Sequence, residues 1–384
     1  MERVGVPTPP QTSELTSEPT PSPPQPALSP DPKAPPEILL SHVPAPISSQ
    51  EIKTRISGPK GVKRWEPSGV VSEGKHLWVV SDREGWLARY QLPLSQGVNH
   101  PTSAYQLQPE LKHRVKWEGL AWERDQDQEI TALLLLEAIS RSVWRCPKPD
   151  LGCPELTQEP LGHINSRIDQ SIPSPFKYVM FEALAHRAEP IIGVRGYQDR
   201  SRGLIPWSVL ASSRGQMLMD ARASFALDQK HYGMSGATYD AKRRGYWITW
   251  SYEDEAGSTQ DAVGGILSFA PLHAQPQSAL GSTPALRLSM GTHHVSSPGH
   301  DAFEICARFN LKPEGVTLNA AGDLFIVFDE DLDRKQGDAT PQGQTERLQR
   351  RFALNDNEDF IWRLPNDHIA QACVTPSTSH SPHP

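Results

Sequence analysis

The pattern of apolar and polar residues along the chain predicts short β-strands. Apolar runs such as "LWVVS", "LLLLE" and "LFIVF" are bounded by Gly, Asp, Asn or other polar residues. Runs of about four to eight apolar residues with such flanks are typical of strands. Stretches with a helical period are scarce, and the best helix candidates are residues 338–354 and 366–372. We therefore expect an all-β protein.

The strand pattern also repeats along the chain. Each copy has Ser or Glu before Gly or Ala, a short strand, a polar turn, an apolar second strand, a variable loop and a third strand. Repeated units of three or four antiparallel strands predict a β-propeller, because a single blade cannot bury both faces of its sheet. The alternative is an open sandwich or two small β domains. The copies begin at Ser68, Glu118, Glu182, Ser235 and Glu314.

Two segments bear on the number of blades and on ring closure. Residues 272–312 either complete the fourth copy or supply part of a sixth, so we expect five or six four-stranded blades. The last copy contains three strands. We expect residues 51–58 ("EIKTRISG") to add its outer strand, since an open sheet edge is a liability.

Composition separates this core from both ends of the chain. Many of the 37 prolines fall in the first fifty or so residues, where apolar residues are few. Such segments do not bury enough surface to offset their ordering entropy. We predict a disordered tether over 1–50, the propeller domain over 51–366 and a disordered tail over 367–384.

Charge and hydropathy exclude some partners. The net charge is −7 and no long basic run occurs, so we expect no nucleic-acid partner. No apolar stretch reaches the length of a membrane helix, and no signal-peptide core is present in the chain as given. A Pro-rich tether is also common after a removed export signal, so the compartment stays open. We expect a monomer.

Four cysteines are present. Cys146 and Cys153 bracket a short loop, and a disulfide between them is plausible in an exported protein. Cys306 lies in an apolar strand and is expected to be a core thiol, whereas Cys373 lies in the predicted tail.

Acidic residues recur where strands of different copies should meet. The start of the first strand and the end of the second fall at the same end of an antiparallel blade, so these residues should converge at the mouth of the central channel. Crowded carboxylates favour a compensating cation, and calcium accepts six to eight oxygen ligands. The predicted metal ligands are Asp82, Glu118, Glu137, Glu182, Glu314 and Asp329.

Two further residues are catalytic candidates. Arg195 stands where other copies have an acid, so it is expected either to bind an anionic substrate or to pair with a neighbouring acid. His231 precedes the fourth copy and is a candidate general base or a simple loop residue. No serine-hydrolase elbow or Gly-rich phosphate loop is present.

The motifs "WEGLAW", "FEALAH" and "KPEGVTL…GDLFIVFDED" resemble the esterase-like phytase β-propeller family over residues 65–365. The resemblance implies a bacterial, often exported enzyme that uses calcium to hydrolyse a phosphate or ester. The Ser residues in the first and fourth copies, Arg195, and the lack of a dense Lys/Arg cluster argue against phytate itself.

Two hypotheses of different class follow. The first is a calcium-dependent hydrolase, a phosphoesterase or esterase, that acts on a small molecule at an acidic channel mouth. The alternative is a non-catalytic propeller that serves as a binding or scaffolding module for a protein partner.

Overall fold

The computed structural model describes fourteen segments, all of them within the compact unit Glu37–Pro384. The helix candidate at 338–354 lies outside them, as do the residues of the predicted tether up to 44. The described segments are 45–48, 51–62, 65–82, 84–108, 115–161, 178–197, 206–214, 217–221, 225–227, 230–252, 264–272, 286–287, 304–329 and 357–373.

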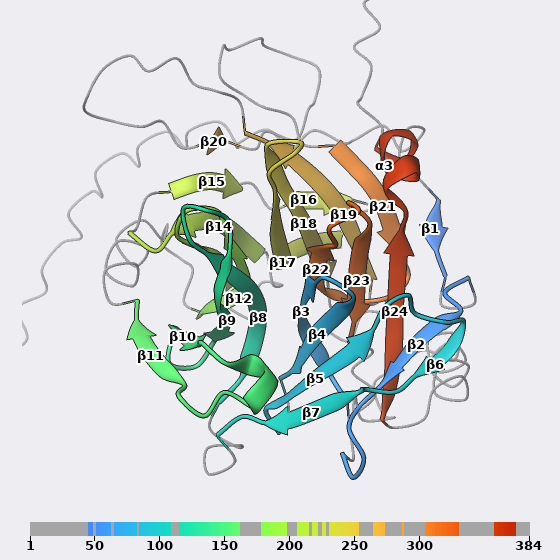
Figure 1. The fold of residues 1–384 in the computed structure, drawn as a ribbon. Helices are drawn as coiled ribbons and strands as arrows, with labels where there is room; N and C mark the ends of the chain where they lie inside the picture. Colours follow the sequence, from blue (N-terminus) through green and yellow to red (C-terminus); the bar gives the residue numbers. More distant parts are fainter. Residues whose placement is uncertain are drawn as a thin grey trace, which may run out of the picture. The chain divides into compact units, whose positions relative to one another are not determined.

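The described strands form five sheets, one for each copy of the sequence repeat. The inner strands β3, β8, β12, β17 and β22 surround the centre of a ring, and β22 lies against β3 (Figure 1). The prediction of a β-propeller is therefore confirmed. From the inner strand outward, the first blade contains β3 (Pro67–Glu73), β4 (His76–Ser81), β5 (Trp86–Gln91) and β7 (Ser103–Gln106), and the second contains β8 (Trp117–Arg124), β9 (Ile130–Glu137), β10 (Ser142–Cys146) and β11 (Thr157–Pro160). The third contains β12 (Tyr178–His186), β13 (Pro190–Tyr197), β14 (Pro206–Ser212) and β15 (Met217–Ala221), and the fourth contains β17 (Lys230–Asp240), β18 (Gly245–Tyr252), β19 (Gly264–Pro271) and β21 (Glu304–Phe309). The fifth contains β22 (Pro313–Leu318), β23 (Leu324–Phe328), β24 (Glu358–Leu364) and β2 (Thr54–Ser57).

Strand β2, from the N-terminal part of the domain, closes the ring, as the sequence predicts. Strand β2 pairs antiparallel with β24, with Arg55 opposite Phe360. The Tyr90 hydroxyl of the first blade donates a 2.7 Å hydrogen bond to the Ser57 carbonyl, and Ile56 is fully buried. The first and last parts of the domain therefore share one blade and one core.

The segment between the fourth and fifth copies does not build a sixth blade in the part that the structure describes. Strand β21 is the outer strand of the fourth blade, where it pairs with β19. The short strand β20 (Leu286–Arg287) pairs with β15 of the third blade instead. Three more short strands extend the sheets of the blades: β1 (Pro46–Ile47), β6 (Gly97–Asn99) and β16 (Phe225–Leu227).

Apolar cores fill the spaces between neighbouring blades. Val327 of β23 and Val79 of β4 belong to one buried cluster between the last and first blades, and four similar clusters separate the other neighbours. Each sheet is thus covered on both faces. This explains why the second strands are continuous apolar runs instead of alternating ones.

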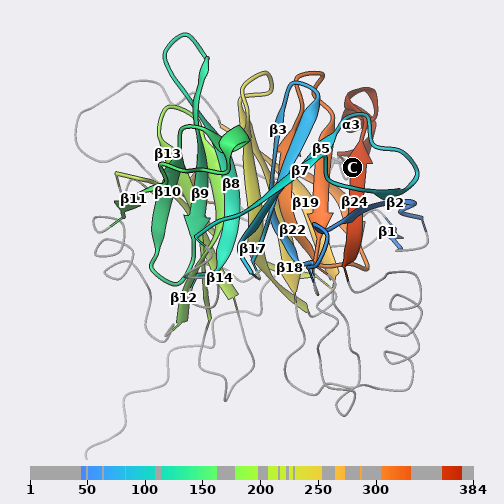
Figure 2. The same cartoon turned by 60° about the horizontal axis from the view of Figure 1, so that its bottom comes forward.

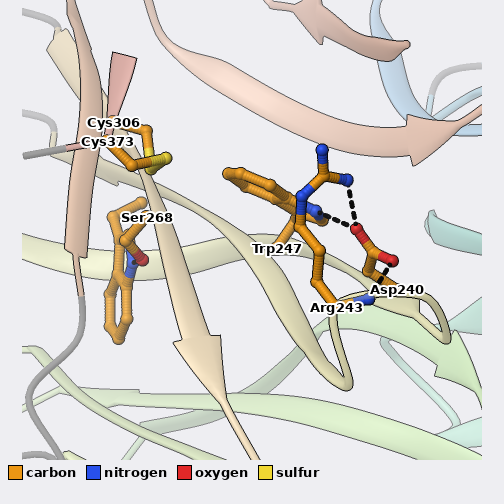
Figure 3. Close-up of a disulfide and its surroundings, with 7 residues drawn as sticks. Asp240, Arg243, Trp247, Ser268, Cys306 and Cys373 are labelled. Atoms are coloured by element: carbon orange, nitrogen blue, oxygen red, sulfur yellow. Dashed lines mark hydrogen bonds and ion pairs between the residues drawn. A yellow bond between two sulfur atoms is a disulfide. The ribbon is translucent and has the colours of Figure 1, made fainter. Parts of the chain in front are cut away.

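The C-terminal helix candidate forms, and a disulfide holds it. Helix α3 (Asn366–Ala372) follows β24, and Cys373 is bonded to Cys306 of β21 (Figure 3). The expectation of a free thiol at Cys306 is wrong, because the end of the last blade returns to the outer edge of the fourth. The Cys146–Cys153 disulfide is also present, beside the short 3₁₀ helix η3 (Pro149–Leu151).

Within the described residues, no helix combines the length and the apolar composition that crossing a membrane requires.

Candidate functional site

Each inner strand carries a β-bulge at the residue that opens its sequence repeat. In the first blade, Pro67 is opposite Ser81 and Gly69 is opposite Val80, so the residue between them has no partner. A bulge of this kind re-aims the side chain of the extra residue. The bulged residues are Ser68, Glu118, Glu182, Ser235 and Glu314.

The small residue after each bulge allows the inner strands to approach closely. A Cβ added at Gly69 would lie 2.9 Å from the Gly119 Cα atom, and one added at Gly236 would lie 2.5 Å from the Glu314 carbonyl oxygen. Larger residues would push neighbouring blades apart. The glycines of the repeat are therefore explained by packing at the centre of the ring.

Three bulged glutamates come together there. One carboxylate oxygen from each of Glu118, Glu182 and Glu314 lies within 4.8 Å of the other two, and all three residues are buried. We call these residues the glutamate cluster. The structure thus brings together three of the six acids that the sequence suggested as metal ligands.

The two bulged serines connect blades. The Ser235 hydroxyl of the fourth blade donates a 2.6 Å hydrogen bond to the Pro313 carbonyl of the fifth blade. The Ser68 hydroxyl of the first blade donates a hydrogen bond to the Trp117 carbonyl of the second blade. Serine at these positions thus takes part in joining the ring and adds no charge to the cluster.

Two lysines lie directly beside the cluster. Lys116 and Lys312 each stand two residues before the bulge of their blade. The Lys116 ammonium is in contact with Glu118, and the Lys312 Nζ atom lies 2.8 Å from Glu314 and 3.3 Å from Asp329. The second and fifth blades therefore present matching lysine–glutamate pairs.

Arg195 provides a third positive charge. One of its terminal nitrogens lies 3.3 Å from a Glu182 oxygen, and the other donates a 3.4 Å hydrogen bond to the Ser251 hydroxyl of the fourth blade. Of the two alternatives for Arg195, the ion pair with a neighbouring acid is thus present in the structure.

Strand register separates Glu137 from the other strand-end acids. The backbone amides of Asp82, Ala138 and Asp329 donate to the carbonyls two residues before the bulge, so these three positions are equivalent. Glu137 is one residue out of phase with Asp82 and Asp329, and a one-residue shift in a strand turns the side chain to the other face.

Both oxygens of Glu137 are used by the backbone. They accept hydrogen bonds from the amides of Lys116 (3.1 Å), Ile139 (2.9 Å) and Ser140 (2.6 Å). Glu137 therefore stabilises the turn between β9 and β10. A metal ion at Glu137 would have to displace these backbone hydrogen bonds.

Asp82 extends the acidic site toward the first blade. Burial, followed by the charges of Asp329 and Glu66, raises the pKa of Asp82 well above its usual value, although Lys116 opposes this shift. The Lys116 ammonium is 3.8 Å from an Asp82 oxygen. A carboxyl group in this position retains its proton in a pH range where an exposed aspartate has lost it.

Burial also dominates the pKa shifts of Glu118 and Glu314. It raises the pKa of Glu118 to about 8, with Glu182 and Asp82 adding to the shift and Lys116 opposing it. Burial raises the pKa of Glu314 to about 8 as well, opposed by Lys312. The lysines therefore compensate only part of the cost of holding these carboxylates together.

The second catalytic candidate is placed only in part. The backbone of His231 lies in β17, opposite Ala226 of β16. Its side chain lies outside the described structure, so its role as a base stays a prediction.

Sequence reasoning missed the residue two positions before each bulge. The equivalent tetrapeptides are "EPSG", "KWEG", "MFEA", "GMSG" and "KPEG". Extending the alignment two residues upstream of Ser68, Glu118 and Glu314 reveals Glu66, Lys116 and Lys312, because three of the five copies have a charged residue at that position.

The spacing of the glutamate oxygens fits a metal ion. Calcium binds oxygen at about 2.3–2.6 Å, so two ligand oxygens of one ion lie at most about 5 Å apart. The three glutamate oxygens lie within 4.8 Å of one another, so their separations satisfy this condition. Lys116 and Lys312 already contact Glu118 and Glu314, so an ion bound to these carboxylates would compete with the two lysines.

Comparison with known proteins leaves the family open. No family model matches the chain, and no curated protein matches it. The phytase-like resemblance thus stays a prediction.

The chain does match solved structures at low similarity. A glutaminyl cyclase from Myxococcus xanthus matches with 12% identity and a TM-score of 0.30, over 73% of this chain and 94% of that one. An α-L-arabinofuranosidase from Podospora anserina matches with 9% identity and a TM-score of 0.38, over 82% and 97%. A glycosyl hydrolase from Bacteroides ovatus matches with 8% identity and a TM-score of 0.38, over 79% and 84%. Similarity at this level carries no conclusion about activity.

Proposed function

We propose that the protein is a calcium-dependent hydrolase whose metal site is the glutamate cluster. The observation that supports this is the convergence of three buried carboxylate oxygens within 4.8 Å, from bulges on three separate blades. Burial, with a smaller contribution from neighbouring carboxylates, raises the pKa of Glu118 and of Glu314 to about 8, so the lysines do not fully compensate the cost of ionising these two groups. A divalent cation would supply the missing compensation.

Calcium suits this donor set because it accepts a flexible shell of oxygen ligands. Three carboxylates leave room for water and a substrate oxygen. A bound metal of this type polarises a phosphoryl or acyl oxygen and lowers the pKa of bound water.

The basic residues of the site fit a small phosphate or ester substrate. Lys116, Lys312 and Arg195 each contact a glutamate of the cluster. When a cation takes over the compensation of those glutamates, the three basic side chains become available to hold a negatively charged substrate. Arg195 is suited to bidentate binding of a phosphate.

Proton transfer is assigned to carboxyl groups with raised pKa values. Asp82 lies next to Lys116 and remains protonated above the usual range of aspartate, so it is positioned to give a proton to a leaving group. His231 is the candidate base.

The test is hydrolysis of a panel of phosphate and acyl esters by the full chain, in calcium and in EDTA. Turnover that requires calcium and falls at least about a hundredfold in Glu118→Gln supports the proposal. Glu155→Gln is the matched control, because Glu155 forms an exposed ion pair with Lys148. Turnover that is unchanged by EDTA or by Glu118→Gln would contradict it.

One observation favours the non-catalytic alternative. Every glutamate of the cluster already has a basic partner, and Ser68 and Ser235 bond to the next blade. If the site only joins the blades, Glu118→Gln alters stability while no ester is hydrolysed under either condition.

A further inference from the structure

A separate pocket lies at the opposite end of the blades from the glutamate cluster. Its volume is about 620 Å³, within the range of small-molecule sites. The turn between β3 and β4 and the turn between β22 and β23 both border it, whereas the cluster lies where β3 and β22 begin. The β3 hairpin is at the upper end of the blades in Figure 2. The lining residues that matter here are Lys75, Leu92, Leu94, Gln96, Phe325 and Arg363.

The floor of this pocket is apolar. Phe325 and Ile361 belong to the buried cluster between the first and last blades, and the partly buried Leu92 and Leu94 pack against the same cluster. The Leu92 amide donates a 2.7 Å hydrogen bond to the Lys75 carbonyl, which holds the leucine beside the β3–β4 turn. An apolar body can therefore be buried here against residues of two blades.

The charged groups at the rim give the pocket a positive balance. Arg363 lies 2.7 Å from Asp323, and the second Asp323 oxygen accepts a 3.0 Å hydrogen bond from the Asn366 amide. The acid is thus neutralised and occupied by the protein. Lys75 is exposed, and none of the ion pairs found among the described residues includes it.

We propose that this pocket binds a small organic anion, a carboxylate or a phosphate monoester, with a compact apolar body. The apolar body packs on Phe325, Ile361 and Leu94, and the anionic group lies near Lys75. This assignment is independent of the proposed hydrolase activity, because the two sites lie at opposite ends of the blades.

The experiment is calorimetric titration of the full chain in EDTA with naphthoate and with naphthyl phosphate. Naphthylmethanol and naphthylmethylammonium serve as the neutral and cationic analogues. We expect saturable binding of at least one anion, about fivefold or more tighter than either analogue. Comparing the two anions tells a carboxylate site from a phosphate site.

Two substitutions locate the site. We expect Lys75→Gln and Gln96→Glu each to weaken binding of the anion by about threefold to fivefold, because the first removes a positive charge from the lining of the pocket and the second adds a negative charge to it. Lys60→Gln is the matched control, since Lys60 is another exposed lysine in a turn that does not line the pocket. Equal affinity for the neutral analogue, absence of saturable binding, or anion binding insensitive to both substitutions would overturn the proposal.

Discussion

Glu118 and Glu314 belong to blades that are not neighbours in the ring, yet carboxylate oxygens of the two lie within 4.8 Å of each other. Each glutamate contacts a lysine from two residues earlier in its own chain segment. The centre of the ring therefore combines two lysine–glutamate pairs with Glu182. Because like charges this close repel, protonation or a bound cation should control the stability of the propeller.

The first prediction concerns the pH dependence of stability. Glu118 and Glu314 have a pKa of about 8 in the folded protein, against an ordinary value of 4.5, so the folded state holds protons that the unfolded state releases. The stabilisation that these protons give the folded state is fully present below the ordinary pKa of 4.5 and is lost as pH rises through 8. The free energy of unfolding falls by at most about 1.4 kcal/mol per pH unit for each group.

We therefore expect the Tm measured in EDTA to be lower at about pH 9 than at about pH 6, two values on either side of the folded-state pKa. Calcium should reverse most of the fall at the higher pH. The variant carrying both Glu118→Gln and Glu314→Gln is the control, and its Tm should vary much less. A wild-type Tm that rises over the same interval would contradict the assignment.

The second prediction concerns metal affinity. Glu314→Gln removes one carboxylate from the cluster, so we expect calcium to bind at least about tenfold more weakly, which is roughly 1.4 kcal/mol. Affinity of the wild type should rise with pH, since protons compete with the metal for Glu118 and Glu314. Isothermal titration checks both results. Glu155→Gln should bind as the wild type does, and a similar loss in that control would place the ion elsewhere.

The third prediction concerns Lys312. It pairs with both Glu314 and Asp329, and its side chain is 12% exposed. Lys312→Met would leave two buried acids without this partner, so we expect a loss of roughly 3 kcal/mol in the free energy of unfolding at neutral pH. Calcium should recover part of the loss.

Lys148→Met is the matched control for Lys312→Met. Lys148 forms an exposed pair with Glu155, 3.3 Å apart, and exposed pairs contribute about 1 kcal/mol or less. Urea denaturation of both variants gives the comparison. Equal losses would mean that the Lys312 pair is effectively solvated.

Much of this architecture was readable from the sequence because blade packing imposes a local pattern. The runs "LWVVS" and "LFIVF" lie between covered faces and are apolar throughout. The closing strand at 54–57 was predictable because the last copy lacked an outer strand. Glu118, Glu182 and Glu314 were found because each opens its repeat.

The rest depended on register and on chain return, which the sequence does not display. Glu137 follows an apolar run in the sequence, as Asp82 and Asp329 do, but in the strand it is one residue out of register with those two positions. This shift in register turns its carboxylate toward backbone amides. The partner of Cys306 lies 67 residues away, after the three strands β22, β23 and β24 of the fifth blade.

The last prediction uses that distant disulfide. In the chain-entropy model, a cross-link stabilises more when it closes a longer loop, about 4 kcal/mol for the 67-residue separation of Cys306 and Cys373 and about 2 kcal/mol for the 7-residue separation of Cys146 and Cys153. We expect the paired substitution to serine of Cys306 and Cys373 to lower the free energy of unfolding more than the same change at Cys146 and Cys153. Guanidinium denaturation without reductant measures both. Helix α3 should remain docked in the first variant, because Ile369 is buried in the core between the fourth and fifth blades. A larger loss from the short loop would mean that packing around Cys146, which is itself fully buried, outweighs the entropy of loop closure.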